Sequence, residues 1–256
     1  MTNDNIAAIA ARIRLGGRHV AFTGAGISTE SGIPDYRSQG GIWDKFCPVY
    51  FDEFMSSRAA REEYWRRWTA MYPGIKAAVP NPAHRALADL HRNGHLDAVI
   101  TQNIDGLHQA SGLPEESVVE LHGNTRRIRC MRCRTIVPIQ DVRRRLADGD
   151  SAPECACGGY LKPDTISFGQ SMPAAEVEKA VRLSRTCDLF LAVGSTLQVQ
   201  PAAQMPYLAK DNGAFMAIVN LSETPCDAFF DVRIQDKAGY VLPRIVNAIG
   251  MPLMLK

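Results

Sequence analysis

Four cysteines in two close pairs could bind a metal ion. Cys130 and Cys133 form the first pair, and Cys155 and Cys157 form the second pair further along the chain. Two such pairs are typical of a zinc ribbon, in which four thiolates surround one ion as a tetrahedron. Four cysteine ligands leave no open coordination position, so the pattern predicts a structural zinc ion. The second pair has one residue between its cysteines where two are usual, and the competing interpretation is four unrelated thiols.

A glycine-rich turn with polar neighbours could bind a phosphate group. Gly24 and Gly26 follow the apolar segment 19–22, and glycine lets the backbone approach a ligand closely. Ser28 and Thr29 can begin a short helix whose free N–H groups favour phosphate. The dinucleotide pattern G-x-G-x-x-G would need a glycine in place of Thr29. By itself, the turn indicates either a pyrophosphate site or an ordinary connection between a strand and a helix.

Polar or small residues also follow four other apolar segments that are typical of strands. They are Gln102 to Asp105 after residues 97–101, His122 after 118–121, Gly194 to Thr196 after 188–193, and Asn220 after 214–219. Ligands of open parallel sheets bind beside the carboxyl ends of the strands, so these residues should face the glycine turn. An imidazole in such a place can serve as a general base, although a lone histidine is also commonly structural. The polar run at 103–106 is also compatible with a simple turn.

Hydrophobic periodicity predicts the elements that position these residues. Helices are expected at 6–15, 52–72, 83–92, 174–185, 200–211 and 241–249, and strands at 19–22, 97–101, 118–121, 161–169, 188–193 and 214–219. Residues 39–50 are expected to form an irregular aromatic loop over the glycine turn. We expect the strand at 161–169 to return to the large sheet.

The alternation of strands and helices predicts an α/β fold with a doubly wound parallel sheet and a smaller inserted module. The large lobe would comprise residues 1–37, 81–124 and 163–256, with a helical module at 38–80 and a zinc-ribbon insertion at 125–162. Together these segments form a single domain spanning 1–256.

Composition excludes several classes of function. The 256 residues are 46% hydrophobic and carry a net charge of +2, so nucleic acid is not expected as a partner. Eight arginines between positions 126 and 145 are interpreted as a solvated surface. No apolar run has the length of a membrane span, and the first residues do not resemble a signal peptide. We therefore expect a cytoplasmic protein that does not associate with membranes.

Together, these motifs resemble the sirtuin family of NAD-dependent protein lysine deacylases. The resemblance rests on Gly24 to Ser28, Pro34 to Arg37, Thr101 to Asp105, His122 to Asn124, the four cysteines and Gly194-Ser195. It covers nearly the whole chain, from about residue 20 to 249, and implies a single catalytic domain with a Rossmann-like fold. In its N-terminal half the chain is most similar to the class II branch, but it lacks the long insertion which that branch has in its ribbon.

The resemblance assigns roles to individual residues. Those implied to bind NAD are Gly24, Ala25, Gly26, Thr29, Asp35, Tyr36, Arg37, Gln102, Ile104, Asp105, Gly194, Ser195, Thr196, Asn220 and Ala238. His122 is implied to be the general base, and Asn103 to order water near the reacting ribose. The peptide would enter as an added β-strand between Phe168-Gly169 and Gln198-Val199. The products would be free lysine, nicotinamide and 2′-O-acyl-ADP-ribose.

The acyl group and even the reaction type remain open at this stage. Acetyl-lysine is the expected substrate, but Tyr64 and Arg67 have the spacing with which desuccinylating sirtuins bind an acyl carboxylate. The same spacing also occurs in an ordinary amphipathic helix with aromatic packing. Longer acyl groups such as lipoyl, mono-ADP-ribosyl transfer to protein, and a non-catalytic module that binds NAD or ADP-ribose are the alternatives.

Overall fold

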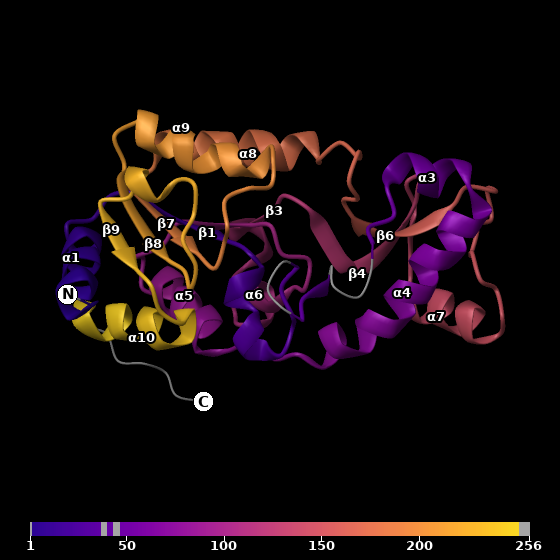
Figure 1. Ribbon diagram of the computed structural model, residues 1–256, viewed down its shortest axis with the longest axis horizontal. Coiled ribbons are helices and arrows are strands. Elements are labelled where there is room, and N and C mark those ends of the chain that lie inside the picture. Colours follow the sequence, from indigo (N-terminus) through magenta and orange to yellow (C-terminus); the bar gives the residue numbers. More distant parts are fainter. Residues whose placement is uncertain (1, 37–39, 43–46, 251–256) are drawn as a thin grey trace.

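The computed structural model describes residues 2–36, 40–42 and 47–250, and its main element is a six-stranded parallel sheet (Figure 1). The strand order is β3-β2-β1-β7-β8-β9. The strands are β1 (His19–Thr23), β2 (Ala98–Thr101), β3 (Val118–Glu120), β7 (Leu189–Val193), β8 (Phe215–Val219) and β9 (Val232–Ile234). This order is that of a Rossmann fold, so the doubly wound sheet predicted from the sequence is confirmed.

Helices cover both faces of the large sheet (Figure 1). One face packs against α1 (Thr2–Arg14), α5 (Pro82–Arg92) and α10 (Ala238–Ile249). The other face packs against α8 (Ala174–Thr186) and α9 (Met205–Asp211). All five residues of β1 are buried, because a parallel strand between two helical layers has no face toward water. Short connections add α6 (Leu107–Ala110) and the 3-10 helices Ala25–Ile27, Thr29–Ser31, Glu115–Ser117, Ala202–Gln204 and Asp227–Phe229.

The start of α5 shows how local sequence fixes an element near the site. Asn81 precedes the helix, and its Oδ1 accepts hydrogen bonds from the N–H groups of Ala83 and His84. Pro82 occupies the first helical position, where its missing N–H costs nothing. The amide of Asn81 donates to the carbonyl of Ile27 at 2.7 Å, so the helix start also holds the segment that follows the glycine turn.

A second, three-stranded antiparallel sheet forms the smaller part of the molecule. It consists of β5 (Ile136–Val137), β4 (Gly123–Cys130) and β6 (Leu161–Thr165), in that order. The prediction that 161–169 returns to the large sheet was wrong, because β6 pairs with β4 and ends at Thr165. A short segment with strand-like composition fits a small sheet as well as a large one, so local sequence could not decide its partner.

The helices α3 (Phe51–Ser56), α4 (Arg58–Ala77) and α7 (Ile139–Ala147) pack around this small sheet. The helical segment predicted at 52–72 is therefore divided into two helices, and the second continues to Ala77. Ser57 separates them, because its backbone is extended and its hydroxyl accepts from the N–H of Ala60 as an N-cap. Trp65 and Trp68 of α4 share a core with Ile128 and Leu161 of the small sheet, so the helical module packs beside the ribbon.

The other predicted strands and helices are confirmed to within a few residues, while β4, β5, β9, α6 and α7 had no counterpart in the prediction. None of the helices in the described ranges is long and apolar enough to cross a membrane. The loop predicted at 39–50 lies partly outside the described residues.

Candidate active site

The site begins where the order of the large sheet reverses, between β1 and β7. Gly24 and Gly26 follow β1, and Gly194 follows β7. The N–H of Gly26 donates to the carbonyl of Gly194 at 2.8 Å. A Cβ on Gly24 would lie 2.7 Å from the Gly194 oxygen, and one on Gly26 would lie 2.8 Å from the Gly194 Cα. The two strand ends can therefore pack this closely only because both residues are glycine. The crevice lies beside these strand ends, where the order of the sheet reverses.

A cavity of about 250 Å³ occupies this crevice, and we call it the nucleotide cavity. It collects residues from the ends of all six strands of the large sheet and from the loop after the glycine turn. Predicted residues in its lining are Gly24, Ala25, Gly26, Thr29, Asp35, Tyr36, Gln102, Asn103, His122, Gly194, Ser195, Thr196, Val199, Asn220 and Ala238. The structure thus brings together residues that are up to 214 positions apart, as Gly24 and Ala238 show.

Hydrogen bonds tie the strand ends together across the nucleotide cavity. The amide of Gln102 after β2 donates to Ser195 Oγ after β7 at 2.9 Å. The amide of Asn103 donates to the carbonyl of Gly24 at 3.0 Å and to Ser28 Oγ at 3.1 Å. Ser28 in turn donates its proton to the carboxylate of Asp105 at 2.7 Å. These side chains are therefore held rigidly before any ligand binds.

Asp105 does not line either cavity but lies directly behind Ser28. Its second oxygen accepts from the N–H of Leu107 at the start of α6. Burial raises the pKa of the Asp105 carboxyl, and the hydrogen bonds from Leu107 and Ser28 oppose that shift. The carboxyl group can therefore serve as an anchor for Ser28. The sequence indicated Ser28 only as the possible start of a helix, so its contacts with Asn103 and Asp105 were not predicted.

His122 lies on the boundary of the nucleotide cavity and a second cavity. Its Nδ1 lies 3.0 Å from the carbonyl oxygen of Gln102. A carbonyl can only accept, so Nδ1 carries the proton and Nε2 keeps its lone pair. Burial lowers the pKa of His122, with the hydrogen bond to Gln102 opposing the shift, so the ring is neutral near pH 7. A neutral imidazole with a fixed tautomer is the state that a general base requires.

The second cavity, of about 320 Å³, lies between the two sheets and is mainly lined by apolar side chains; we call it the apolar cavity. Its lining includes Ile42, Val49, Tyr64, Arg67, Trp68, Met71, Ile75, Ile104, Ile166, Phe168, Gly169 and Val199. Four residues line both cavities: Tyr36, Gln102, His122 and Val199. A polar compartment and an apolar compartment therefore meet at one imidazole.

Tyr64 and Arg67 both line the apolar cavity from α4, one helical turn apart. The Tyr64 hydroxyl lies 3.1 Å from Thr165 Oγ1, and burial raises its pKa to about 12, so it stays protonated. The guanidinium of Arg67 donates to the carboxylate of Glu63 at 2.5 Å. Glu63 also pairs with Arg66, and the two arginines lower its pKa to about 2, so it is ionised at every working pH. The positive charge of Arg67 is thus largely balanced by Glu63.

Some predicted residues lie elsewhere. Arg37 lies outside the described residues. Gln198 is exposed and lines neither cavity, and Ile104 lines only the apolar cavity. The nucleotide cavity also includes Glu30, Val219, Leu221, Ser222, Asp236 and Lys237, which sequence reasoning missed. Glu30 accepts a hydrogen bond from the N–H of Gly239 in the first turn of α10, a contact between segments too distant for local patterns to reveal.

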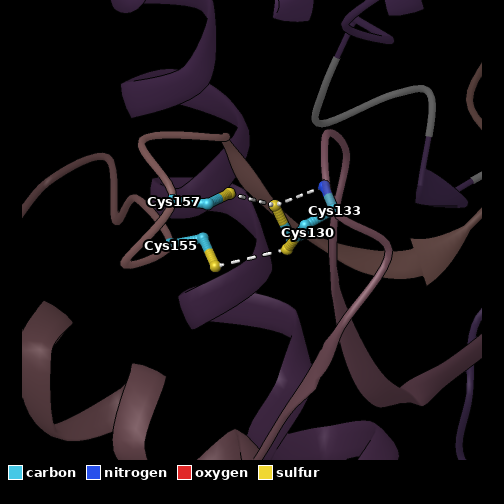
Figure 2. A group of neighbouring side chains, drawn as sticks. All are labelled: Cys130, Cys133, Cys155 and Cys157. Atoms are coloured by element: carbon cyan, nitrogen blue, oxygen red, sulfur yellow. Dashed lines mark hydrogen bonds between the residues drawn. The ribbon is translucent and has the colours of Figure 1, made fainter.

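The four cysteines converge at the end of β4, whose last residue is Cys130 (Figure 2). Their sulfur atoms all lie within 4.8 Å of one another. The separations are 3.6 Å for Cys130 and Cys157 and 3.7 Å for Cys133 and Cys155. Four sulfurs about 2.3 Å from one ion would be about 3.8 Å apart, so the cluster has the size of a zinc tetrahedron despite its short second pair. The cysteines form the site of one structural zinc ion.

Most of the arginines between 126 and 145 are paired with acids of the small sheet and of neighbouring segments. The ion pairs within the described residues are Arg126 with Glu115 and Glu120, Arg127 with Glu120 and Asp164, Arg129 with Asp164, Arg144 with Asp141, and Arg145 with Asp150. Five of the eight arginines of this stretch therefore have an acidic partner on the surface.

Comparison with known proteins shows the family to which this chain belongs. The model of the Sir2 family matches residues 24–201. The chain belongs to the Sir2 family. It is 52% identical over 229 residues to NAD-dependent protein deacetylase 1 of Bradyrhizobium diazoefficiens, covering 89% of this chain and 90% of the relative. It is 42% identical over 243 residues to NAD-dependent protein deacylase 2 of Archaeoglobus fulgidus, covering 94% of each.

A solved Sir2 structure with a p53 peptide and NAD+ superposes with a TM-score of 0.85 at 34% identity, covering 94% of this chain and 96% of that one. The Sir2-type fold explains why the nucleotide cavity and the apolar cavity both converge on His122. The class II assignment stays a prediction.

Proposed function

We propose that this Sir2-family protein removes acyl groups from lysine side chains with His122 as the general base. The protein is an NAD-dependent protein lysine deacylase, in line with its deacetylase and deacylase relatives. The observation that carries the assignment of His122 is its place on the boundary of the nucleotide and apolar cavities. Only there can one side chain reach both a bound nucleotide and an acyl group.

The residues of the nucleotide cavity suit NAD. A Cβ at Gly24 or Gly26 would clash with the backbone of Gly194, so glycine lets the ends of β1 and β7 meet closely and leaves bare backbone beside the crevice. Ser195, Thr196 and Asn220 would hold the adenosine half, and Asn103 with Gln102 would face the nicotinamide ribose. NAD supplies an electrophilic ribose carbon when nicotinamide leaves it, and all other steps depend on the residues of this chain.

His122 would take a proton from a ribose hydroxyl through its Nε2. The hydrogen bond from Nδ1 to the Gln102 carbonyl fixes the ring orientation and keeps the basic nitrogen toward the cavities. Because Gln102 also holds Ser195, the base and the nucleotide-binding strand ends are positioned by one residue. Asn103 would order the reacting water, and the Ser28–Asp105 pair would keep its amide in place.

The acyl-lysine would enter through the apolar cavity. Phe168 and Val199 line it from opposite segments, which supports the expected strand-like binding of a peptide between them. An apolar lining favours acetyl and other uncharged acyl groups, because burying a carboxylate without compensation is costly. Acidic acyl groups are the second candidate, since Tyr64 and Arg67 both face this cavity, but Glu63 competes for the same guanidinium.

The decisive experiment compares wild type with two variants at His122. His122→Ala removes the base and its anchor, while His122→Asn keeps an N–H that can donate to the Gln102 carbonyl but has no basic nitrogen. We expect both variants to lose acetyl-peptide deacetylation by about 10²- to 10⁴-fold. Mass spectrometry should show deacetylated peptide, nicotinamide and 2′-O-acyl-ADP-ribose for wild type only.

Other results would contradict this function. Equal activity of wild type and both variants would exclude His122 as the base. Transfer of ADP-ribose to protein without loss of acetyl groups would indicate a mono-ADP-ribosyltransferase. NAD binding without nicotinamide release would indicate a binding module. A panel of acyl groups on one peptide, assayed with wild type and Arg67→Ala, tests the acyl preference. Succinyl-lysine turnover that depends on Arg67 would overturn the preference for uncharged groups.

The remaining proposals follow from the sequence. We propose that residues 1–256 act as one catalytic unit, since both sheets contribute to the apolar cavity. Acyl-lysine proteins are the proposed substrates, and a cytoplasmic location without nucleic-acid partners stays a prediction.

A further inference from the structure

One buried histidine behind the active site has no part in the chemistry described so far. His108 lies on α6, directly after the Asn103–Asp105 segment, and its side chain is 1% exposed. It lines neither cavity. A fully buried imidazole that serves only for packing could be replaced by an apolar side chain, so its hydrogen bonds decide whether it has a further role.

His108 begins a chain of short hydrogen bonds that ends on Asn103. Its Nε2 lies 2.8 Å from Thr23 Oγ1 at the end of β1. Thr23 donates its hydroxyl proton to Thr101 Oγ1 at 2.8 Å, across paired positions of β1 and β2. Thr101 Oγ1 also accepts from the backbone N–H of Asn103 at 3.0 Å. All four residues are buried.

The direction of this chain fixes the tautomer of His108. Thr23 has one hydroxyl proton and gives it to Thr101, so it must accept from His108, and Nε2 carries the ring proton. Nδ1 then holds a lone pair, and it has no hydrogen-bond partner among the described residues. Burial and the neighbouring His84 ring, 5.0 Å away between centroids, hold the pKa of His108 well below its usual value. The ring is therefore a permanent neutral donor.

Asn103 is thus held on two sides. Its side chain is bound by Gly24 and Ser28 in the nucleotide cavity, and its backbone N–H is bound by Thr101. We propose that His108 is a positioning residue for Asn103, acting through Thr23 and Thr101. The proposal rests on the function given above, in which Asn103 orders the reacting water. It predicts that His108 affects turnover and leaves peptide binding unchanged.

Two variants of His108 and one of Thr101 test the proposal. His108→Gln keeps a donor at the position of Nε2, whereas His108→Leu fills a similar volume without a donor. Thr101→Val removes the middle acceptor, keeps a β-branched side chain in β2 and leaves His108 intact. Each protein is assayed for kcat and for the KM of an acetyl-peptide at saturating NAD, with thermal melting to confirm folding.

We expect His108→Leu and Thr101→Val to lower kcat by about tenfold. Losing the free energy of one ordinary hydrogen bond in the transition state changes a rate by about this factor. The peptide KM should stay within about twofold, and His108→Gln should recover most of the loss. The double variant His108→Leu/Thr101→Val should be no worse than either single variant, because both break the same chain.

A merely structural role gives different results. If His108→Leu melts earlier but each folded molecule keeps the wild-type kcat, or if His108→Gln is as slow as His108→Leu, the proposal is wrong. Should His108→Leu not fold, Thr101→Val decides alone, and a wild-type kcat in that variant overturns the proposal. Absence of deacetylation in wild type would instead overturn the proposed function.

Discussion

The acid stability of this protein should depend in part on the buried histidine His84. Its ring is 0% exposed, and its Nδ1 and Nε2 face the N–H of Asn81 and the hydroxyl of Ser28. Burial lowers the pKa of His84 from 6.5 to about 4. The unfolded chain therefore takes up this proton near pH 6.5, and the folded protein takes it up only near pH 4. The stabilisation is fully present above pH 6.5 and is lost as the pH falls through this window.

The size of the effect follows from the same two values. One pKa unit corresponds to about 1.4 kcal/mol, so lowering the pKa from 6.5 to about 4 corresponds to about 3 kcal/mol. In His84→Gln this contribution is absent at all pH values. The variant should be less stable than wild type at pH 7, by about 1–3 kcal/mol, since it disturbs a buried site. At pH 4.5 most of that deficit should have disappeared, because only wild type pays for protonating His84.

Urea unfolding of both proteins at pH 7, 6, 5 and 4.5 measures this difference. Carboxylates and zinc ligands titrate in both proteins and cancel in the comparison, provided the urea dependence of the free energy of unfolding is equal. A difference in the free energy of unfolding that stays constant over this pH range would refute the assignment of His84 as a neutral buried histidine. If the difference grows toward low pH, the pKa of His84 is raised by folding and not lowered, and the assignment is wrong.

Three further predictions concern the site. Gly194→Ala would place a Cβ 2.2 Å from the Ile27 nitrogen, at a residue with φ of 60°. We therefore expect denaturation to show a loss of about 2–5 kcal/mol in the free energy of unfolding. Initial rates should show a KM for NAD that is raised at least about tenfold. Chelation of zinc, or Cys157→Ser, should unfold the small sheet, because zinc binding supplies about 10–16 kcal/mol in such sites. Circular dichroism and metal analysis measure this loss. Refolding of the chelated protein by Mg²⁺ would contradict a structural zinc site. The deacetylation rate of wild type should rise with pH and level off below pH 6.5, because burial lowers the pKa of His122; a rate that still climbs steeply above pH 7.5 would contradict that role.

Much of the site could be predicted from patterns of residues that are close together in the sequence. Strands followed by polar or small residues were recognisable because buried parallel strands are apolar on both faces and end in turns. Cys130, Cys133, Cys155 and Cys157 were recognisable because thiolate pairs at close spacing have few other uses. Both signals depend on residues near one another in the chain, which is why the metal cluster and the strands β1, β2, β3, β7 and β8 were predicted correctly, whereas β4, β5 and β9 were not predicted.

Contacts between distant segments were decided only by the fold. β6 could have joined either sheet, and its pairing with β4 depends on how the ribbon closes. The balance of Arg67 by Glu63 depends on side-chain orientation within α4. The chain from His108 through Thr23 and Thr101 to Asn103 exists because β1 and β2 are in register.

By itself, the sequence determined which residues could do chemistry and that they would gather at one edge of a parallel sheet. The tertiary structure decided that they form two cavities meeting at His122, with a set of buried polar groups behind them. The physical reason is that strand patterns are local, whereas the cavities and the buried hydrogen bonds depend on how strands and helices distant in the chain pack together.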